Sequence, residues 1–353
     1  MNNGNKTTIL SKENCVKVLS LFDGMSCGLI AMMNAGLTIS QYDAFEIDKY
    51  AIKTSSHNFP MIKQHGDVFK ADFTQYSGYD YLIGGSPCTY WSIAQKNNRE
   101  TEASGLGWEL FQQYVRALNE AKPKYFIYEN NRSMSDQIRE SINRAFGFEA
   151  VHINSSLVSA QKRNRLYWVG KRNDDGSYSK VNVETPEDRK VFVRDILDEY
   201  SHKKAIYGDT ADEPVRVGAL PRPNGELSKS QAFRIYDINA KSVTINAGGG
   251  GAGGKTGLYA CPIDDDGYKD KAIYIVKDGY ITINGREYPI KLADGYYIIR
   301  KLSVSECKRL QTVPEWYDFS IVSPAQAYKM LGNGWTCDVI THLIFSILKD
   351  KAE

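Results

Sequence analysis

The clearest indication of the fold is the sequence Asp80-Tyr81-Leu82-Ile83-Gly84-Gly85-Ser86-Pro87-Cys88. Its apolar residues 81–83 predict a short buried strand, which stops where two glycines free the backbone and Pro87 fixes φ. Cys88 then lies just beyond the carboxyl end of that strand. Ligands bind at this edge of an open α/β sheet, so Cys88 is a candidate nucleophile. The alternative is a small buried hydrophobic residue, which many free cysteines are.

The composition is typical of an ordinary folded protein. A chain of 353 residues, 42% hydrophobic and 24% charged, can bury a full core, and its length predicts about two domains. A net charge of +2 neither requires nor excludes nucleic acid as a partner. The six cysteines form no C-x-x-C pair and the five histidines no H-E-x-x-H motif, which argues against a disulfide framework and a zinc site. The polar start and the lack of a membrane-spanning run predict a cytoplasmic protein.

The first two strand ends carry features of a nucleotide site. Residues 16–22 predict a strand that runs into a turn containing Gly24 and Gly28 and then into a helix. Such a turn brings backbone N–H groups against a polar ligand group, although the spacing is not G-x-G-x-x-G and an ordinary βα turn is the alternative. A second strand, residues 42–47, places Glu46 about 20 residues beyond Gly24, where nucleotide-binding folds carry the acid that binds ribose hydroxyls.

The later strand ends continue this pattern. A short strand over residues 61–65 precedes Asp67, for which a turn-capping role is the alternative. A buried strand over residues 125–128 leads to Glu129. Because every predicted strand end carries a chemically useful residue, we expect an α/β fold with a Rossmann-like sheet and helices on both faces.

A basic segment and a polar loop accompany these strands. Alternate side chains of an extended segment point to the same side, so Gln161, Arg163 and Arg165 would lie together. Such a set could donate hydrogen bonds to a carbonyl or phosphate oxygen. The alternative is a solvated basic strand edge. Residues 92–107 are polar and contain glycine, and they are long enough for an active-site loop.

The second half changes character. Residues 171–297 contain charged turns, the glycine tract 247–255 and a hairpin signal at Asn284-Gly285, which predict a smaller domain rich in strands and loops. The tract is either a linker or a loop that approaches a phosphate backbone. Helices then return, beginning with a capping box at Ser303 and Glu306 and ending with an apolar stripe in the last helix.

Taken in order, these motifs resemble those of DNA (cytosine-5) methyltransferases of bacterial or phage type. The matching parts are residues 22–28, Glu46, residues 66–68, 84–88, 129–131, 161–165 and 332–334. Two departures stand out: Glu-Asn-Asn at 129–131 replaces the usual Glu-Asn-Val, and Gly334-Trp335 replaces Ser-Val. The Phe-Asp-Gly loop and the tryptophan lean toward the eukaryotic de novo branch, whereas Asn333 keeps the bacterial form.

The resemblance implies a set of roles. Cys88 would add to C6 of cytosine, Glu129 would hold N3 and N4, and Arg165 would hold O2, with Arg163 counted among the catalytic residues. The cofactor would be S-adenosylmethionine, with Phe22 stacked on its adenine. The residues implied to bind it are Phe22, Gly24, Gly28, Glu46, Asp67, Val68, Pro87, Asn333 and Trp335. Double-stranded DNA would be the partner, with the target base flipped out of the stack.

The resemblance also implies a domain plan. Residues 1–170 and 298–353 would form a discontinuous catalytic domain, and residues 171–297 would form the target-recognition domain. A monomer is expected, with a cognate restriction endonuclease as a candidate partner and with neither metal nor membrane contact.

Three other functions stay open at this point. A nicotinamide oxidoreductase would share the sheet but lacks G-x-G-x-x-G and leaves Pro87-Cys88 without a task. A nucleic-acid-binding module without activity would follow if Cys88 or Glu129 were misplaced. An RNA cytosine-5 methyltransferase acting on transfer RNA has the same fold and is the main alternative.

Overall fold

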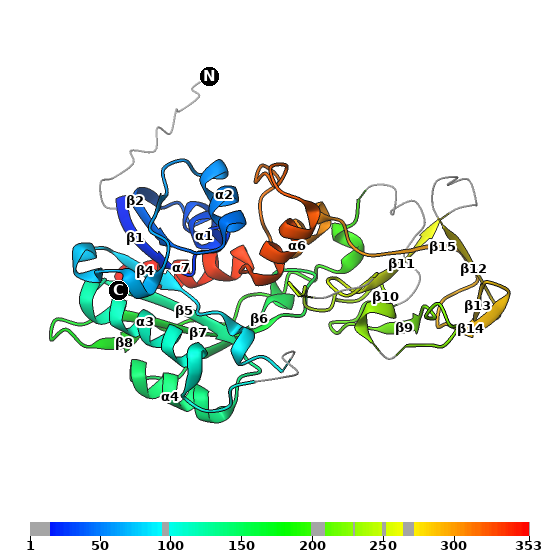
Figure 1. Ribbon diagram of the computed structural model, residues 1–353, viewed down its shortest axis with the longest axis horizontal. Coiled ribbons are helices and arrows are strands. Elements are labelled where there is room, and N and C mark those ends of the chain that lie inside the picture. The colour runs from blue at the N-terminus through cyan, green and yellow to red at the C-terminus, as the bar shows by residue number, and fades with distance from the viewer. Residues whose placement is uncertain are drawn as a thin grey trace, which may run out of the picture.

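The computed structural model describes residues 15–93, 99–198, 209–228, 230–248, 252–263 and 272–352. They form two sheets that lie next to each other along the long axis of the molecule, with helices packed around the first (Figure 1). Among the described residues, no helix is both long and apolar enough to cross a membrane.

The first sheet has the strand order β3-β2-β1-β4-β5-β7-β6, with β8 paired to β7. Strands β3, β2, β1, β4 and β5 are parallel, whereas β7 is antiparallel to its neighbours. The bounds are β1 Cys15–Leu21, β2 Thr38–Phe45, β3 Lys63–Gln64, β4 Tyr81–Gly84, β5 Tyr125–Asn131, β6 Val151–Asn154, β7 Asn164–Arg172 and β8 Tyr178–Lys180. The chain moves outward from β1 to β3 and then returns to β4, so the strand order reverses between β1 and β4. Ligands bind at such a reversal in open α/β sheets.

Helices cover both faces of this sheet, because alternate residues of its strands point to opposite sides. Val18 joins the hydrophobic cluster that contains α1, α2 and α7, whereas the next residue, Leu19, joins the cluster that contains α3 and α4. The bounds are α1 Cys27–Asn34, α2 Lys49–Asn58, α3 Gly105–Ala121, α4 Asp136–Phe146, α5 Val304–Leu310, α6 Pro324–Asn333 and α7 Cys337–Ala352. This arrangement confirms the predicted Rossmann-like fold.

The end of the chain returns to the first sheet, as predicted. The capping box forms, with the Ser303 hydroxyl accepting from Glu306 N and the Glu306 carboxylate accepting from Ser303 N. Helix α7 packs against α1, and the hydroxyl of Thr341 donates to the carbonyl of Ala31 at 3.3 Å. The apolar stripe of α7 packs in the core of the first sheet.

The second sheet has the order β14-β13-β12-β15-β11-β10-β9 and its own small core. Its bounds are β9 Arg216–Ala219, β10 Arg234–Asp237, β11 Leu258–Ile263, β12 Ile273–Lys277, β13 Tyr280–Ile283, β14 Arg286–Pro289 and β15 Gly295–Arg300. The predicted hairpin joins β13 to β14, and Asn284 and Gly285 both have positive φ, 50° and 75°. Positive φ at both positions is what a tight type I′ hairpin turn requires.

The predicted domain boundary and the two predicted loops differ in part from the observed elements. The expected domain limit at residue 170 falls inside β7, and β8 still belongs to the first sheet. Helix α3 begins at Gly105, within the predicted loop 92–107, of which residues 94–98 lie outside the described residues. Residues 249–251 of the glycine tract also lie outside them.

Candidate active site

A cavity opens at the reversal point, where the carboxyl ends of β1 and β4 lie next to each other. It brings together residues from the first sheet and from α6, which are distant in the sequence. The predicted site residues that line it are Phe22, Gly24, Gly28, Glu46, Pro87, Cys88, Glu129, Asn333 and Trp335. Sequence reasoning therefore placed most of its candidates around one cavity.

Glu46 is held rigidly at the edge of this cavity. One carboxylate oxygen, Oε2, accepts the backbone N–H of Gly24 at 2.8 Å, which links the ends of β2 and β1. The other, Oε1, accepts the N–H groups of Ile47 and Asp48, each at 2.8 Å. Carboxylate oxygens have further lone pairs, so an oriented Glu46 can still accept hydrogen bonds from a diol.

Asp67 and Val68 do not line the cavity. Asp67 instead caps a short 3-10 helix, Val68–Lys70, by accepting the N–H of Phe69 at 3.0 Å. Val68 is buried in the cluster on the α3 side of the sheet. For Asp67 the structure shows the turn-capping contact that was the alternative, and its contact with a cofactor stays a prediction.

Cys88 lies where a rigid turn presents it. It is the first residue of a 3-10 helix, Cys88–Tyr90, and its side chain is half-buried at the cavity. The turn before it is fixed by Ser86, whose hydroxyl hydrogen-bonds to that of Tyr128 at 2.7 Å. Asn130 Nδ2 also donates to the Ser86 carbonyl, at 3.1 Å. Cys27 is the other cysteine that lines the cavity, but it is buried.

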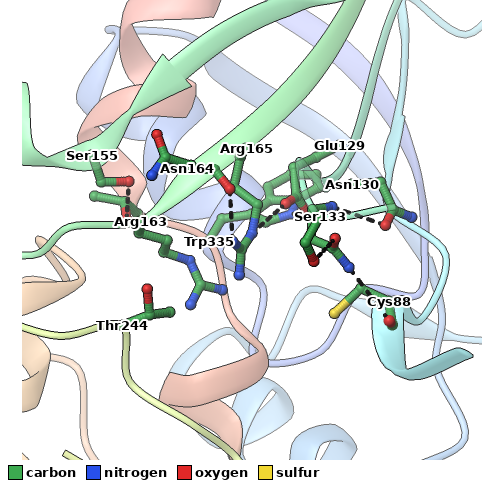
Figure 2. Close-up of polar contacts among 12 residues, drawn as sticks. Cys88, Glu129, Asn130, Ser133, Ser155, Arg163, Asn164, Arg165, Thr244 and Trp335 are labelled. Carbon is green, nitrogen blue, oxygen red and sulfur yellow. Dashed lines mark hydrogen bonds and ion pairs between the residues drawn. The ribbon is translucent and has the colours of Figure 1, made fainter. Parts of the chain in front are cut away.

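Glu129 stands at the end of β5 with both carboxylate oxygens engaged (Figure 2). Oε1 pairs with Arg165 Nε at 2.9 Å, and Oε2 accepts the indole N–H of Trp335 at 2.8 Å. The ion pair is largely shielded, with side-chain exposures of 14% for Arg165 and 12% for Glu129. A Cβ at Gly85 would come within 2.6 Å of the Glu129 carbonyl oxygen, so only glycine permits this approach of β4 to β5.

Arg163 and Gln161 point to different partners from Arg165. Arg163 is buried, and its Nη2 donates to the carbonyls of Gly332 at 3.2 Å and Gly334 at 2.8 Å. Burial, and then the charge of Arg165, lower the pKa of Arg163 to about 10. Its Nη1 has no hydrogen-bond partner within the described part of the chain. Gln161 donates to the Leu310 carbonyl at 3.3 Å, so it supports the fold rather than the cavity.

Sequence reasoning missed the part played by Asn131. Its Nδ2 lies 3.4 Å from the Cys88 carbonyl, and its Oδ1 accepts the hydroxyl of Ser133 at 2.7 Å. This buried amide therefore ties the Cys88 turn to the end of β5. The asparagine at position 131, where the usual motif Glu-Asn-Val has valine, could have indicated this role, because a valine side chain makes no hydrogen bonds.

The polar residue between Phe22 and Gly24 was also missed. Asp23 lines the cavity and accepts the hydroxyls of Ser20 and Tyr42, both at 2.6 Å. Burial raises the pKa of its carboxyl group. These bonds brace the glycine turn against β1 and β2.

The chemistry of the cavity follows from these positions. The cavity is lined by the Cys88 thiol, by the Glu129 carboxylate that pairs with Arg165, and by the fixed Glu46 carboxylate, which can accept a diol. Thiols add to electron-poor carbons, and a paired carboxylate and guanidinium can hold a polar ring while charge moves onto it. Among the described residues there is no group of three or more His, Cys, Asp or Glu side chains that could hold a metal ion.

Comparisons with known proteins agree on one family. The family model described as C-5 cytosine-specific DNA methylase matches residues 16–349. The orphan methyltransferase M.Rho11sI of Bacillus phage rho11s is 28% identical over 305 residues, which cover 69% of this chain and 60% of that protein. The type II methyltransferase M.HhaI of Haemophilus parahaemolyticus is 25% identical over 360 residues, 94% of this chain and 94% of that protein. The chain thus spans somewhat less than two thirds of the phage protein.

Solved structures show the same fold. The S. pombe Dnmt2 methyltransferase superposes with a TM-score of 0.61 at 14% identity, covering 96% of this chain and 99% of that one. A putative DNA modification methyltransferase encoded within an E. coli prophage gives a TM-score of 0.54 at 17% identity, covering 96% of this chain and 100% of that one.

Proposed function

Because this chain belongs to the C-5 cytosine-specific DNA methylase family, we propose that it transfers a methyl group from S-adenosylmethionine to C5 of cytosine in double-stranded DNA. The observation that carries the proposal is that Cys88, Glu129 and Glu46 line one cavity and that Glu129 is paired with Arg165. A nicotinamide oxidoreductase, the alternative that shares the sheet, would leave Cys88 without an assigned role.

The cavity residues fit S-adenosylmethionine, which when bound would supply an electrophilic methyl group on a sulfonium. Glu46 offers a fixed carboxylate for ribose hydroxyls, and Phe22 offers a ring for adenine. Asn333, the last residue of α6, and Trp335, two residues beyond it, also line this cavity. Roles for Asp67 and Val68 in binding this cofactor remain predictions.

The reaction on cytosine would then be divided among three side chains. The Cys88 thiolate forms a bond to C6, and the ring electrons that move toward N3 and O2 are stabilised by Glu129 and Arg165. C5 becomes nucleophilic and would form a bond to the methyl carbon as its bond to the sulfonium sulfur breaks, so that the sulfur leaves as a neutral thioether. Loss of the C5 proton to a base and departure of the thiolate then restore the double bond. Since C6 is inaccessible in stacked DNA, the target base must be flipped out of the duplex.

We also propose that residues 171–297 form the target-recognition domain, apart from the end of β7 and β8, which belong to the first sheet. Its chain contacts the catalytic side: the N–H of Ile245 donates to Gln161 Oε1 at 2.9 Å, and Lys162 N donates to the Ser242 carbonyl at 3.0 Å. A Cβ at Gly332 would lie 2.5 Å from Ala247 N, so α6 also packs tightly on this segment. A second sheet anchored this close to the cavity is suitably placed to read bases beside the target.

Glu46→Ala should weaken cofactor binding selectively. Loss of hydrogen bonds to a charged acceptor costs about 1.5–3 kcal/mol, so affinity for S-adenosylhomocysteine should fall by roughly ten- to a hundredfold. Titration calorimetry measures this directly. Glu140→Gln, on the exposed surface of α4, is the matched control and should bind normally. Unchanged affinity in Glu46→Ala would remove Glu46 from the cofactor site.

The proposed substrate is tested by a direct assay. Purified protein, labelled S-adenosylmethionine and a mixed pool of random duplex DNA and transfer RNA should yield label in DNA alone, with bisulfite sequencing locating 5-methylcytosine. Label in RNA alone would overturn the DNA assignment and favour the RNA alternative. Hydride transfer to a nicotinamide without methyl transfer would overturn the reaction class.

A further inference from the structure

We propose that Trp335 positions Glu129 for the reaction, through a hydrogen bond from its indole N–H to the carboxylate. This inference rests on the proposed function and gives Trp335 a task beyond its expected contact with the cofactor. Trp335 Nε1 donates to Glu129 Oε2 at 2.8 Å, while Arg165 Nε meets Oε1 at 2.9 Å (Figure 2). With a donor on each oxygen, the plane of the carboxylate is fixed before any base arrives.

The backbone that carries Trp335 is itself held by buried donors. Arg163 Nη2 binds the Gly334 carbonyl at 2.8 Å, and Gln311 Nε2 binds the same carbonyl at 3.0 Å. Arg163 is 3% exposed and Gln311 0% exposed, so both donor side chains are buried. This carbonyl belongs to the peptide group that joins Gly334 to Trp335. The two hydrogen bonds therefore hold the backbone from which the indole side chain projects. Arg163 is therefore a positioning residue that acts on Glu129 through Trp335.

Arg163 and Arg165 thus both help to hold the Glu129 carboxylate, one indirectly and one directly. Arg165 reaches Glu129 directly, and Arg163 reaches it through the Gly334 carbonyl and the indole of Trp335. The indole also lines the cofactor cavity. The same ring would therefore contact the cofactor and orient the acid that holds the base.

The kinetic test separates these two tasks. Trp335→Phe keeps an aromatic ring in the cavity but removes the N–H, so kcat should fall about ten- to a hundredfold. Affinity for S-adenosylhomocysteine and KM for DNA should stay near wild type. Trp168→Phe is the matched control, because it removes a comparable indole bond, 2.9 Å to Asn143 Oδ1, on a side chain outside the cavity. Its kcat should not change.

A spectroscopic test does not depend on turnover. The chain has five tryptophans, so the ¹⁵N-labelled protein should give five indole N–H resonances, and Trp335→Phe identifies one of them. Glu129→Gln replaces the charged acceptor by a neutral one, which should move that resonance upfield and leave the Trp168 resonance in place.

The outcomes are distinguishable. A stationary Trp335 resonance in Glu129→Gln, or a wild-type kcat in Trp335→Phe, would overturn this inference alone if the wild-type protein methylates DNA. A wild-type protein without methyl transfer would overturn the proposed function and this inference with it.

Discussion

Replacing Cys88 by alanine or serine should abolish methyl transfer. The Cys88 thiolate is the group proposed to form a bond with the base, and a serine hydroxyl is far less nucleophilic at neutral pH. We expect turnover to fall by more than about a thousandfold, the order of loss that follows removal of a nucleophile. The measurement is transfer of labelled methyl groups to duplex DNA, with S-adenosylhomocysteine binding followed in parallel.

Cofactor affinity should survive in both Cys88 variants, because the fixed Glu46 carboxylate and the glycine turn are untouched. Cys15→Ala is the matched control, since Cys15 is an exposed cysteine at the opposite end of the sheet, at the start of β1. It should retain full activity. Turnover above a trace in either Cys88 variant would mean that another group attacks the base.

Replacing Glu129 by glutamine should lower kcat by about a hundredfold or more, within the range for loss of a positioned acid or base. Glutamine is close in shape and can still accept from Arg165, so the fold should be kept. What it loses is the negative charge and the ability to exchange a proton with N3 of cytosine. Single-turnover methylation under saturating cofactor measures the chemical step directly.

Two controls accompany this prediction. Glu140→Gln makes the same chemical change on the surface of α4 and should be neutral. Thermal unfolding of Glu129→Gln should match wild type to within a few degrees, which would exclude unfolding as the cause of the loss. A single-turnover rate equal to that of wild type would show that Glu129 has no part in the chemistry.

Much of the fold could be predicted because its signals are local. The apolar run before Cys88, the glycine turn after β1 and the capping box at Ser303 each depend on a few neighbouring residues, and each formed as expected. The gathering of Glu46, Cys88 and Glu129 also followed, because parallel strands present their carboxyl ends at one edge.

The parts that could not be predicted depend on contacts between distant residues. Trp335 and Glu129 are 206 positions apart, and nothing near either one indicates that an indole meets this carboxylate. Alternation placed Arg163 and Arg165 on one side, but β7 begins only at Asn164, and the segment before it pairs with the 242–245 region. Arg163 therefore binds the backbone beside Trp335, whereas Arg165 binds Glu129.

In the proposed reaction, Cys88 forms a covalent bond with the target cytosine. Its most direct test is incubation with S-adenosylmethionine and duplex DNA in which 5-fluorocytosine replaces cytosine, followed by intact mass analysis under denaturing conditions. Fluorine cannot leave C5 as a cation, so the thiol should stay bound to C6. We predict a stable protein–DNA adduct that maps to Cys88, forms equally in Cys15→Ala and is missing in Cys88→Ala. Wild-type protein that methylates ordinary DNA but forms no adduct, or an adduct on another residue, would show that Cys88 is not the nucleophile.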